Sequence, residues 1–384
     1  MIYWEQMNAR PTPTGPAKLL HVHWPLVILI CCVCGAGFLM LYSVAGGNLD
    51  RWARPQMMRF GLGIIAMLFI AMIHVDFWRR ISIFAYLGGL ALLLAVEFIG
   101  EVGMGAQRWI DLGPLRLQPS ELMKVALVMV IAQYYAWLPQ EKVSHPFWVA
   151  VPLVMTAIPV MLVLKQPDLG TSILMVAGAG VVMFLAGVSW WYFGTAIAAV
   201  ATTVWAVFES RGQTWQLLND YQYRRIDIFL DPSKDPLGAG YHITQAKIAL
   251  GAGGLSGRGF MQGTQSRLDF LPEKHTDFIF TSLAEQFGFV GGLTLLGLYT
   301  AIIMFCLLSA FSNRDRFGAL MTGGLTATFF FFFAVNMAMV MGLLPVVGVP
   351  LPLVSYGGSA MLVLLGAFGL IQSAHVHRPR GAYG

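Results

Sequence analysis

The chain has 384 residues, of which 57% are hydrophobic and only 11% are charged, with a net charge of +5. A soluble domain would carry about a quarter charged residues, so the composition excludes an ordinary soluble protein and favours a polytopic membrane protein. The positive charge does not indicate nucleic-acid binding, because the cations cluster in the connections between apolar runs, as membrane topology requires. The four cysteines lie inside apolar runs and are predicted to be buried free thiols.

Ten apolar runs, each close to the roughly 20 residues that a bilayer core needs, predict an all-α membrane protein with about ten transmembrane helices. The first run is expected to be a retained helix and not a cleaved signal peptide. Gly288, Gly291 and Gly292 predict a break or tilt in the eighth helix, and Asn336 in the ninth needs an internal partner. The runs cover approximately residues 24–45, 57–74, 80–99, 121–138, 147–164, 171–188, 190–208, 278–309, 318–342 and 353–374.

The distribution of cations predicts the topology. If the ten spans alternate in direction, both termini lie on the side that the positive-inside rule makes cytoplasmic. We expect one transmembrane domain over residues 1–384, with 209–278 as a large extracytoplasmic loop between the seventh and eighth helices. The charge bias is incomplete, because Arg51, Arg54, Arg108 and Arg116 fall outside. The cations on the predicted cytoplasmic side are Arg10, Lys18, Arg79, Arg80, Lys142, Arg314, Arg316, Arg378 and Arg380.

Four segments on the predicted outer side are rich in glycine, proline and polar residues: 105–124, 165–172, 209–278 and 345–359. Irregular backbone at membrane depth is tolerated only against protein or a water-filled cavity. Since all four segments fall on the same side, we expect them to converge on one outward-facing site.

Charged residues in the first two segments allow structural and functional interpretations. Glu121 and Lys124 lie three residues apart at the start of a helix and can pair on one face. Lys124 is either half of a structural ion pair or a residue that lines a substrate cavity, and both can hold. Asp168 is interpreted chiefly as the cap of the following helix. Arg108, next to Trp109, is either an anchor at the membrane interface or a residue that grips a lipid-linked substrate.

The long polar segment has no simple basic patch, because it carries eight basic and eight acidic residues between positions 209 and 277. Residues 245–250 are expected to form a short amphipathic helix that carries Lys247. The glycine-rich run 251–259, which includes Arg258, is not a dinucleotide fingerprint, because its spacing is wrong and no βαβ unit surrounds it. Its N–H groups could cradle a phosphate, although a tight surface loop is the simpler interpretation.

Asp277 stands where the chain re-enters an apolar run, directly after Lys274, His275 and Thr276. A carboxylate at such a depth is a candidate for function by default. His275 and Asp277 could form half of a metal site, or a base with a polar neighbour. On the tripeptide alone, a helix cap by Thr276 or Asp277 is the simpler interpretation.

Together these motifs resemble the SEDS family (shape, elongation, division and sporulation) over nearly the whole chain, and runs 235–242 and 263–273 favour its RodA branch over its FtsW branch. The resemblance implies a peptidoglycan glycosyltransferase that polymerises lipid II during cell-wall elongation in the bacterial cytoplasmic (inner) membrane. It also implies that Asp277 is the essential carboxylate and that a class B penicillin-binding protein is the partner. The matching stretches are 105–109, 118–124, 166–172, 235–242, 263–266, 271–280 and 345–359.

In that reaction Asp277 is our hypothesis for the general base that takes the proton of the acceptor sugar hydroxyl. The lipid pyrophosphate leaves without help from a protein acid, but its charge needs cations or a divalent metal such as Mg or Mn. No metal-ligand set is assigned to the protein itself. The candidate substrate-binding residues are Lys124, Glu121, Arg108, Asp168, Lys247, Arg258, Lys274 and His275.

Two other functions compete with this one: a transporter that flips lipid II across the membrane, and a non-enzymatic scaffold that only recruits the penicillin-binding protein. A transporter should show matching short or broken helices in its two halves, and no convincing internal repeat is found. A scaffold would leave the polar groups near Asp277 without a task.

Overall fold

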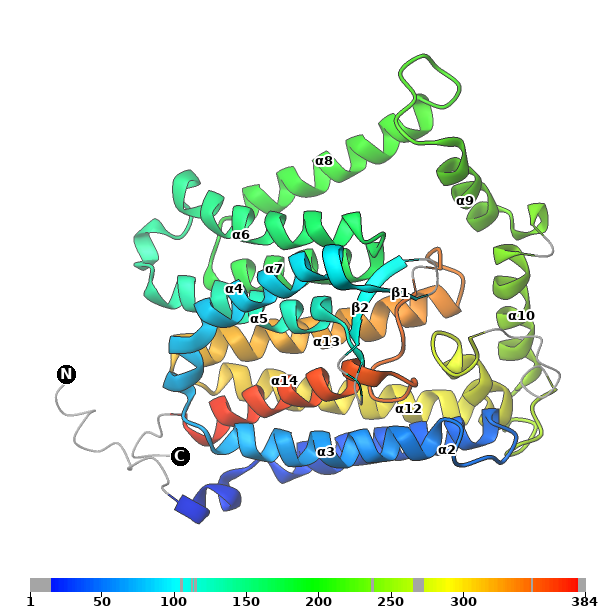
Figure 1. The fold of residues 1–384 in the computed structure, drawn as a ribbon, viewed down its shortest axis with the longest axis horizontal. Helices are drawn as coiled ribbons and strands as arrows, with labels where there is room; N and C mark the ends of the chain where they lie inside the picture. The colour runs from blue at the N-terminus through cyan, green and yellow to red at the C-terminus, as the bar shows by residue number, and fades with distance from the viewer. Residues whose placement is uncertain are drawn as a thin grey trace.

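The structure, a computed structural model, describes residues 15–103, 106–111, 113, 116–235, 238–264, 273–346 and 348–378. Within these ranges ten long helices make up most of the molecule (Figure 1). They are α2 (Trp24–Val44), α3 (Ala53–Met72), α4 (Val75–Ile99), α5 (Pro119–Trp137), α6 (Pro146–Lys165), α7 (Leu169–Ala186), α8 (Trp190–Glu209), α12 (Ile279–Phe311), α13 (Arg316–Val340) and α14 (Gly358–Val376). All except α5 are apolar enough to be candidate membrane spans, and α5 carries Glu121 and Lys124. The predicted all-α polytopic membrane fold is confirmed.

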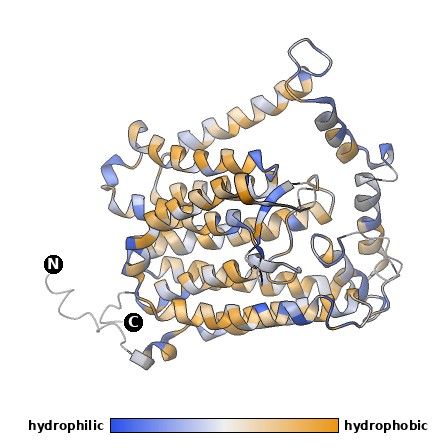
Figure 2. Cartoon of the chain, viewed as in Figure 1, coloured by the Kyte–Doolittle hydropathy of each residue, from blue (hydrophilic) through white to orange (hydrophobic). Residues whose placement is uncertain are grey.

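The two ends of the bundle differ in what they carry. The short helix η1 (Gly15–His21), η2 (Gln140–Lys142) and the last turn of α14 lie at one end (Figure 1). The opposite end carries α9 (Asp220–Leu230), η3 (Pro232–Lys234) and α10 (Ala239–Ala252), which form an arch from α8 to α12. Hydrophobic residues follow the helices, and hydrophilic residues gather at their ends and in α9 (Figure 2). The described part of 209–278 therefore lies opposite the end that holds η1.

A small antiparallel sheet, which the sequence analysis did not anticipate, lies at the same end as the arch. It consists of β1 (Glu101–Gly103), β2 (Ala106–Asp111) and β3 (Arg116–Leu117), in that order. Ile110 of β2 pairs with Leu117 of β3. The sheet contacts the ends of α4, α5 and α14, so it holds the connection between α4 and α5 against the bundle.

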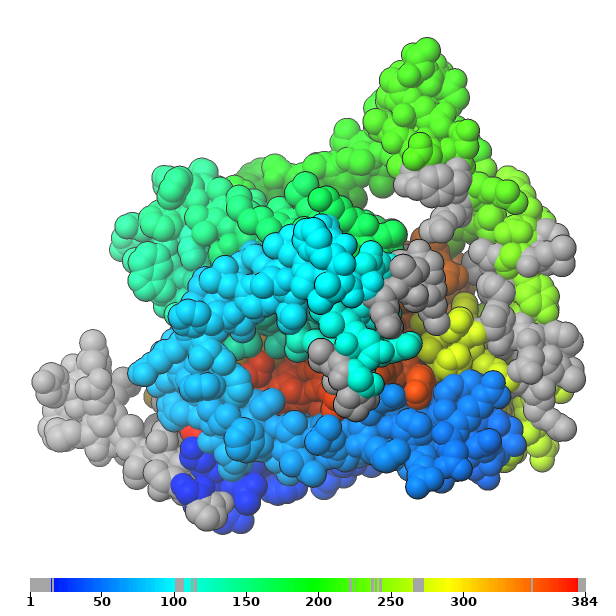
Figure 3. Space-filling view, in the orientation of Figure 1, coloured from blue at the N-terminus to red at the C-terminus, as the bar shows by residue number. Residues whose placement is uncertain are grey.

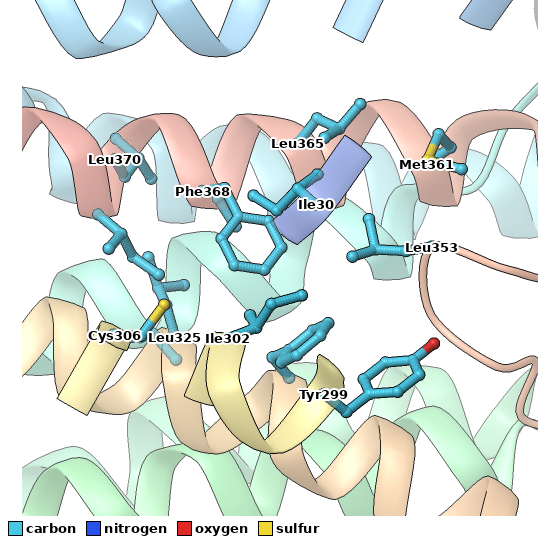
Figure 4. Close-up of a cluster of buried hydrophobic side chains, with 14 of the residues drawn as sticks. Ile30, Tyr299, Ile302, Cys306, Leu325, Leu353, Met361, Leu365, Phe368 and Leu370 are labelled. Carbon is cyan, nitrogen blue, oxygen red and sulfur yellow. The ribbon is translucent and has the colours of Figure 1, made fainter. Parts of the chain in front are cut away.

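The core joins helices that are far apart in the sequence. Ile30 of α2, Ile302 of α12 and Phe368 of α14 are buried against one another (Figure 4). The buried Tyr299 hydroxyl of α12 donates a hydrogen bond to the carbonyl of Pro352, in the segment before α14. This bond fixes an irregular segment at membrane depth against a core helix, as such backbone requires.

The four cysteines are free thiols, but only Cys34 and Cys306 are buried. Cys31 and Cys32 are exposed on α2, so the prediction of burial was wrong for these two. Hydropathy does not separate lipid-facing from protein-facing positions, because lipid tails are as apolar as a protein core.

Helix α12 is broken at Gly288, as the sequence predicted, with a φ angle of 65°. The loop after α10 packs into the break. The Phe289 N–H donates to the Gly254 carbonyl (2.9 Å), and the Arg258 N–H donates to the Glu285 carbonyl (3.0 Å). Backbone groups freed by the break therefore find partners in the loop, which makes the break tolerable in a membrane protein.

Candidate active site

Asp277 lies in the turn that leads into α12. Its carboxylate faces the segment before α14, since a Cβ added to Gly348 would lie 3.8 Å from Asp277 Oδ2. It accepts no hydrogen bond from the residues that the structure describes. Burial, and to a lesser degree the negative charge of Glu273, raises the pKa of Asp277 from 3.8 to about 6. A carboxyl with a pKa near neutrality is suited to accept and release a proton.

The backbone of the tripeptide 275–277 is held by hydrogen bonds to all three of its carbonyls. The first carbonyl accepts from the Tyr356 N–H (2.9 Å), the second from Ser355 Oγ (2.6 Å) and the third from Asn336 Nδ2 (3.0 Å). Asn336 Nδ2 also donates to the Val349 carbonyl (2.7 Å). Asn336 has thus found the internal partner that the sequence analysis required.

His275 is packed against two aromatic rings, and one of them is stacked on it. Its ring lies on the Trp52 ring, with centroids 4.5 Å apart and planes 5° apart, and 6.0 Å from the Tyr356 ring. The Arg51 guanidinium covers the Trp52 ring, 4.4 Å from its centroid. Burial lowers the pKa of His275, which keeps the ring neutral near pH 7.

The helix-cap interpretation of Thr276 and Asp277 is wrong. The N-cap residue of α12 is Phe278, and no side chain caps this helix. Thr276 Oγ1 instead donates to Glu273 Oε2 (2.9 Å). The Asp277 carboxylate therefore does not cap the N-terminus of α12. A role in binding or catalysis remains the better explanation of its position.

Among the described residues, no group of three or more His, Cys, Asp or Glu side chains could hold a metal ion. The described residues therefore supply no further ligands to complete a metal site with His275 and Asp277. The His275 ring is instead packed against Trp52.

Lys124 and Glu121 form a buried ion pair with 2.8 Å between Lys124 Nζ and Glu121 Oε1. The two residues are only 4% and 8% exposed. Lys124 Nζ also lies 3.9 Å from the centroid of the Phe332 ring. Both residues line a cavity whose wall includes Gln56 of α3, Leu351 and Ser355 before α14, and Met361 of α14. Lys124 is thus both half of an ion pair and part of a cavity wall, so the two interpretations are compatible.

Gln56 joins this cavity to the turn that holds Asp277. Its Nε2 donates to the Ser355 carbonyl (3.1 Å), and its Oε1 accepts from the Gly357 N–H (3.4 Å). Ser355, in the segment before α14, in turn donates a hydrogen bond from its Oγ to the carbonyl of residue 276 in the tripeptide. The sequence analysis missed Gln56, which stands directly before the predicted apolar run 57–74 and so gave no signal of its own.

An apolar groove opens beside this cavity. It lies between α3 and α4, with α14 visible at its floor (Figure 3). Its lining includes Ile70, Gly89, Leu122 and Leu362, and it reaches Ser359 toward the sheet. Three residues line both the groove and the cavity: Val125, Val363 and Ala367. The groove and the cavity that contains Lys124 are therefore neighbours.

Arg108 and Asp168 mainly hold the outer segments together. The Arg108 guanidinium donates to the carbonyls of Gln166 (2.9 Å) and Pro167. Asp168 caps α7 by accepting the Thr171 N–H (3.1 Å), which confirms that prediction.

Gln118 connects these segments to the end of α14. Its Nε2 donates to Asp168 Oδ2 (3.3 Å) and its N–H donates to Ser359 Oγ (3.2 Å). The described parts of 105–124, 165–172 and 345–359 thus converge, as predicted from their shared side.

The basic residues of the long segment occupy different surroundings. Lys247 is exposed on α10, a helix that includes the predicted 245–250 but begins earlier, and Lys274 is half-buried beside the tripeptide. Arg258 donates to the Ala252 carbonyl (3.3 Å) and to Thr264 Oγ1 (3.0 Å). The N–H groups of residues 258 and 259 donate to carbonyls of α12. These two N–H groups are therefore not free for a phosphate, which favours the surface-loop interpretation.

Arg59 of α3 is a further cation that the sequence analysis missed. Its guanidinium lies over the Tyr356 ring, 5.0 Å from the centroid. Arg59 Nη1 is buried and has no hydrogen-bond partner among the described residues. A buried guanidinium nitrogen without an acceptor is costly unless an anion completes its surroundings.

The model of the FtsW/RodA/SpoVE family of cell cycle proteins matches residues 24–380. The chain belongs to this family. Membership in the FtsW/RodA/SpoVE family confirms the resemblance inferred from the motifs, and the match runs from the first long helix to beyond the last.

Relatives in the FtsW/RodA/SpoVE family align along the whole chain. Peptidoglycan glycosyltransferase MrdB of Escherichia coli (strain K12) is 42% identical over 378 residues, covering 98% of this chain and 96% of that protein. One solved structure is a chain of a peptidoglycan synthase complex that coordinates polymerization and crosslinking: TM-score 0.81, 31% identity, 93% of this chain and 98% of that one. Rod shape determining protein RodA of Thermus thermophilus has a TM-score of 0.70 and 27% identity, covering 93% and 97%.

Proposed function

We propose that the chain is a peptidoglycan glycosyltransferase that polymerises lipid II into glycan strands, with Asp277 as the general base. The observation that carries the proposal is the Asp277 carboxyl, partly buried, with a pKa of about 6 and no hydrogen bond from the described residues. The names of the relatives support the same activity, since MrdB of E. coli is a peptidoglycan glycosyltransferase.

The reaction needs one base and one stabilised leaving group. The oxygen of the acceptor sugar hydroxyl forms a bond to the anomeric carbon of the donor as the bond from that carbon to the pyrophosphate oxygen breaks. Asp277 takes the hydroxyl proton, and the lipid pyrophosphate leaves with the bonding electrons. A base with a pKa near 6 is mostly ionised at neutral pH and still basic enough to help this transfer.

Cations near the cavity are the candidates for the pyrophosphate. Lys124 lines the cavity, Lys274 precedes the tripeptide, and Arg59 offers a buried nitrogen without an acceptor among the described residues. The described residues contain no three-ligand metal cage, but Mg²⁺ is commonly held by one or two carboxylates together with substrate phosphates. A Mg or Mn ion held mainly by the substrate's own phosphates would neutralise charge on the pyrophosphate and leave Asp277 free to act as the base.

The other predicted contacts divide by their surroundings. Hydrogen bonds within the protein involve the side chains of Arg108, Asp168 and Arg258. We therefore propose that these three residues shape the site and do not bind the substrate directly. Lys247 is exposed on α10 and contributes at most long-range attraction. His275 is the better candidate for a sugar contact, because it belongs to the same tripeptide as Asp277 and its ring is held in place on Trp52.

The apolar groove between α3 and α4 is proposed to hold the lipid tail. It shares Val125, Val363 and Ala367 with the cavity that contains Lys124. A lipid-linked sugar needs this arrangement, with an apolar channel beside a cavity that carries charged side chains such as Lys124 and Glu121. A substrate seated there would keep its tail in the bilayer while its sugars reach the outer end of the bundle.

The proposed partner is a class B penicillin-binding protein, and the proposed location is the bacterial cytoplasmic (inner) membrane. The likeness to a chain of a peptidoglycan synthase complex that coordinates polymerization and crosslinking supports such a partner. The chain is a multi-pass membrane protein by its helices and its family. The cations at the η1 end favour a cytoplasmic placement of that end.

The test is polymerisation of purified lipid II by the chain together with a class B penicillin-binding protein. Wild type should form glycan polymer, and Asp277→Asn, which keeps the size of the side chain, should form none while folding normally. Polymer from both would remove Asp277 from the role of base. Absence of polymer from wild type, with transfer of lipid II across sealed vesicles, would favour the transporter, and absence of both activities would favour the scaffold.

A further inference from the structure

The tripeptide 275–277 is held through its backbone and not through its carboxylate. Its three successive carbonyls accept hydrogen bonds from the Tyr356 N–H (2.9 Å), Ser355 Oγ (2.6 Å) and Asn336 Nδ2 (3.0 Å). Two of the three donors are side chains, so a substitution can remove each of them separately. The third carbonyl belongs to Asp277 itself.

Both side-chain donors are themselves fixed by the segment before α14. Ser355 Oγ accepts the Leu351 N–H (2.8 Å), and the Ser355 carbonyl accepts from Gln56 of α3 (3.1 Å). Asn336 Nδ2 donates a second hydrogen bond to the Val349 carbonyl (2.7 Å). The tripeptide is thus connected to α3 and α13 through groups whose own positions are determined.

Stability alone does not explain Asn336. The residue is fully buried, and its Oδ1 has no hydrogen-bond partner in the part of the chain that the structure describes. A buried amide oxygen without a donor is unfavourable, and leucine, of similar shape, would avoid that penalty. The orientation of the amide follows from its neighbours, because two carbonyls face Nδ2 and only a donor suits them.

We infer that Asn336 and Ser355 are positioning residues for Asp277, an inference that rests on the proposed function. They hold the backbone of the tripeptide and leave the carboxylate oxygens unoccupied. A general base needs both properties, since it must be within hydrogen-bond reach of its proton and must have a lone pair free to accept it. A hydrogen bond to the carboxylate itself would fix its position but weaken it as a base.

A matched pair of substitutions isolates the Ser355 hydroxyl. Ser355→Thr and Ser355→Val add the same bulk, and only threonine keeps the donor to the carbonyl of residue 276. We expect Ser355→Thr to polymerise lipid II several-fold faster than Ser355→Val. The valine variant should lose roughly ten- to a hundred-fold in kcat with little change in KM, which is the scale of a displacement of about 1 Å. Equal kcat for the two folded variants would overturn the role of Ser355.

Asn336→Leu removes the second donor, and Thr326→Val is its matched control. Thr326 is also buried on α13, but its hydroxyl donates to the Thr322 carbonyl within the same helix (2.7 Å). We expect Asn336→Leu to lower kcat ten- to a hundred-fold and to move the acid limb of the pH–rate profile to lower pH, because a released Asp277 gains water. The control should change neither quantity.

Asp277→Asn, assayed in parallel, separates the two claims. An inactive Asp277→Asn together with a folded Asn336→Leu that keeps wild-type kcat and pH profile would refute the positioning role and leave the proposed function intact. An active Asp277→Asn would refute both the role of Asp277 as base and the positioning role of Asn336 and Ser355. If Asn336→Leu does not fold, the serine pair decides alone.

Discussion

Trp52 and His275 stack almost parallel, with ring centroids 4.5 Å apart and planes 5° apart. Trp52 precedes the first turn of α3, and His275 stands two residues before Asp277. The stack therefore connects the start of α3 to the turn that leads into α12. Burial lowers the pKa of His275 and keeps its ring neutral beside the Arg51 guanidinium. The contact therefore holds the first residue of the tripeptide by its side chain, in addition to the bonds to its backbone.

Replacing Trp52 tests the importance of this stack. Trp52→Leu should lower the rate of lipid II polymerisation roughly three- to ten-fold, because an aromatic pair contributes about 0.5–1.5 kcal/mol beyond its buried area. Trp52→Phe should retain most of the rate, since it keeps a ring against His275. The rates of the two purified variants provide the measurement, and a leucine variant as active as the phenylalanine variant would contradict the prediction.

The raised pKa of Asp277 predicts a pH-dependent gain in stability for Asp277→Asn. The pKa is about 6 in the folded protein against an ordinary 3.8, so folding favours the protonated form. The contribution of that proton to stability is complete below about pH 4 and is lost as the pH rises through about 6.

Asparagine is neutral throughout, so Asp277→Asn should be more stable than wild type at pH 7.5 by roughly 1–3 kcal/mol, and equally stable near pH 4. Thermal unfolding in detergent at both pH values measures this. A variant that is less stable than wild type at pH 7.5 would show that the carboxylate is stabilised by a partner.

Glu273→Gln should shift the activity profile without abolishing activity. The negative charge of Glu273 is the second cause of the raised pKa of Asp277, so its removal lowers that pKa. The acid limb of kcat, expected near pH 6 in wild type, should move down by roughly a few tenths of a pH unit. Glu141→Gln, at the opposite end of the bundle, is the control and should leave the profile unchanged. An upward shift for Glu273→Gln would contradict the assignment of the acid limb to Asp277.

The buried pair of Lys124 and Glu121 predicts a separation of stability from activity. Lys124→Met leaves the Glu121 carboxylate buried without its partner and should destabilise the protein by roughly 3–5 kcal/mol. Adding Glu121→Gln removes the orphaned charge and should restore most of the stability. Activity should stay low in the double variant, because the proposed pyrophosphate contact of Lys124 is still missing. Recovery of both stability and activity would make the pair purely structural.

The break in α12 predicts that Gly288 tolerates no side chain. Its φ angle is 65°, and an added Cβ would lie 2.3 Å from the Gly257 nitrogen. Gly288→Ala should therefore lower stability by roughly 1–3 kcal/mol or more. Gly297→Ala, in the regular part of the same helix and with open space around its Cβ, should be tolerated. Comparison of the two melting temperatures tests the prediction, which equal values would contradict.

Features that depend on neighbours in the sequence were predictable. Apolar length identified the transmembrane helices, a three-residue spacing predicted the pair of Glu121 and Lys124, and Asp168 was identified as a cap. Glycines predicted the break in α12. Each of these follows from residues within a turn or two of one another, where backbone geometry alone sets the distance.

Hydropathy could not tell which apolar surfaces face lipid, so the burial predicted for Cys31 and Cys32 failed. The sequence also could not show that the Arg108 guanidinium is occupied by backbone carbonyls. Free and occupied polar groups look alike in a sequence, because the partner is chosen by packing.

The sequence by itself determined a polytopic all-α membrane protein with a conspicuous carboxylate at position 277, because helix length and local polarity are local quantities. Only the tertiary structure decided how that carboxylate is held. The bonds from Asn336 to Asp277 and from Gln56 to Ser355 span 59 and 299 residues of chain. No periodicity encodes such contacts. They arise because buried carbonyls at membrane depth must find donors, and the nearest donors belong to whichever helices pack beside them.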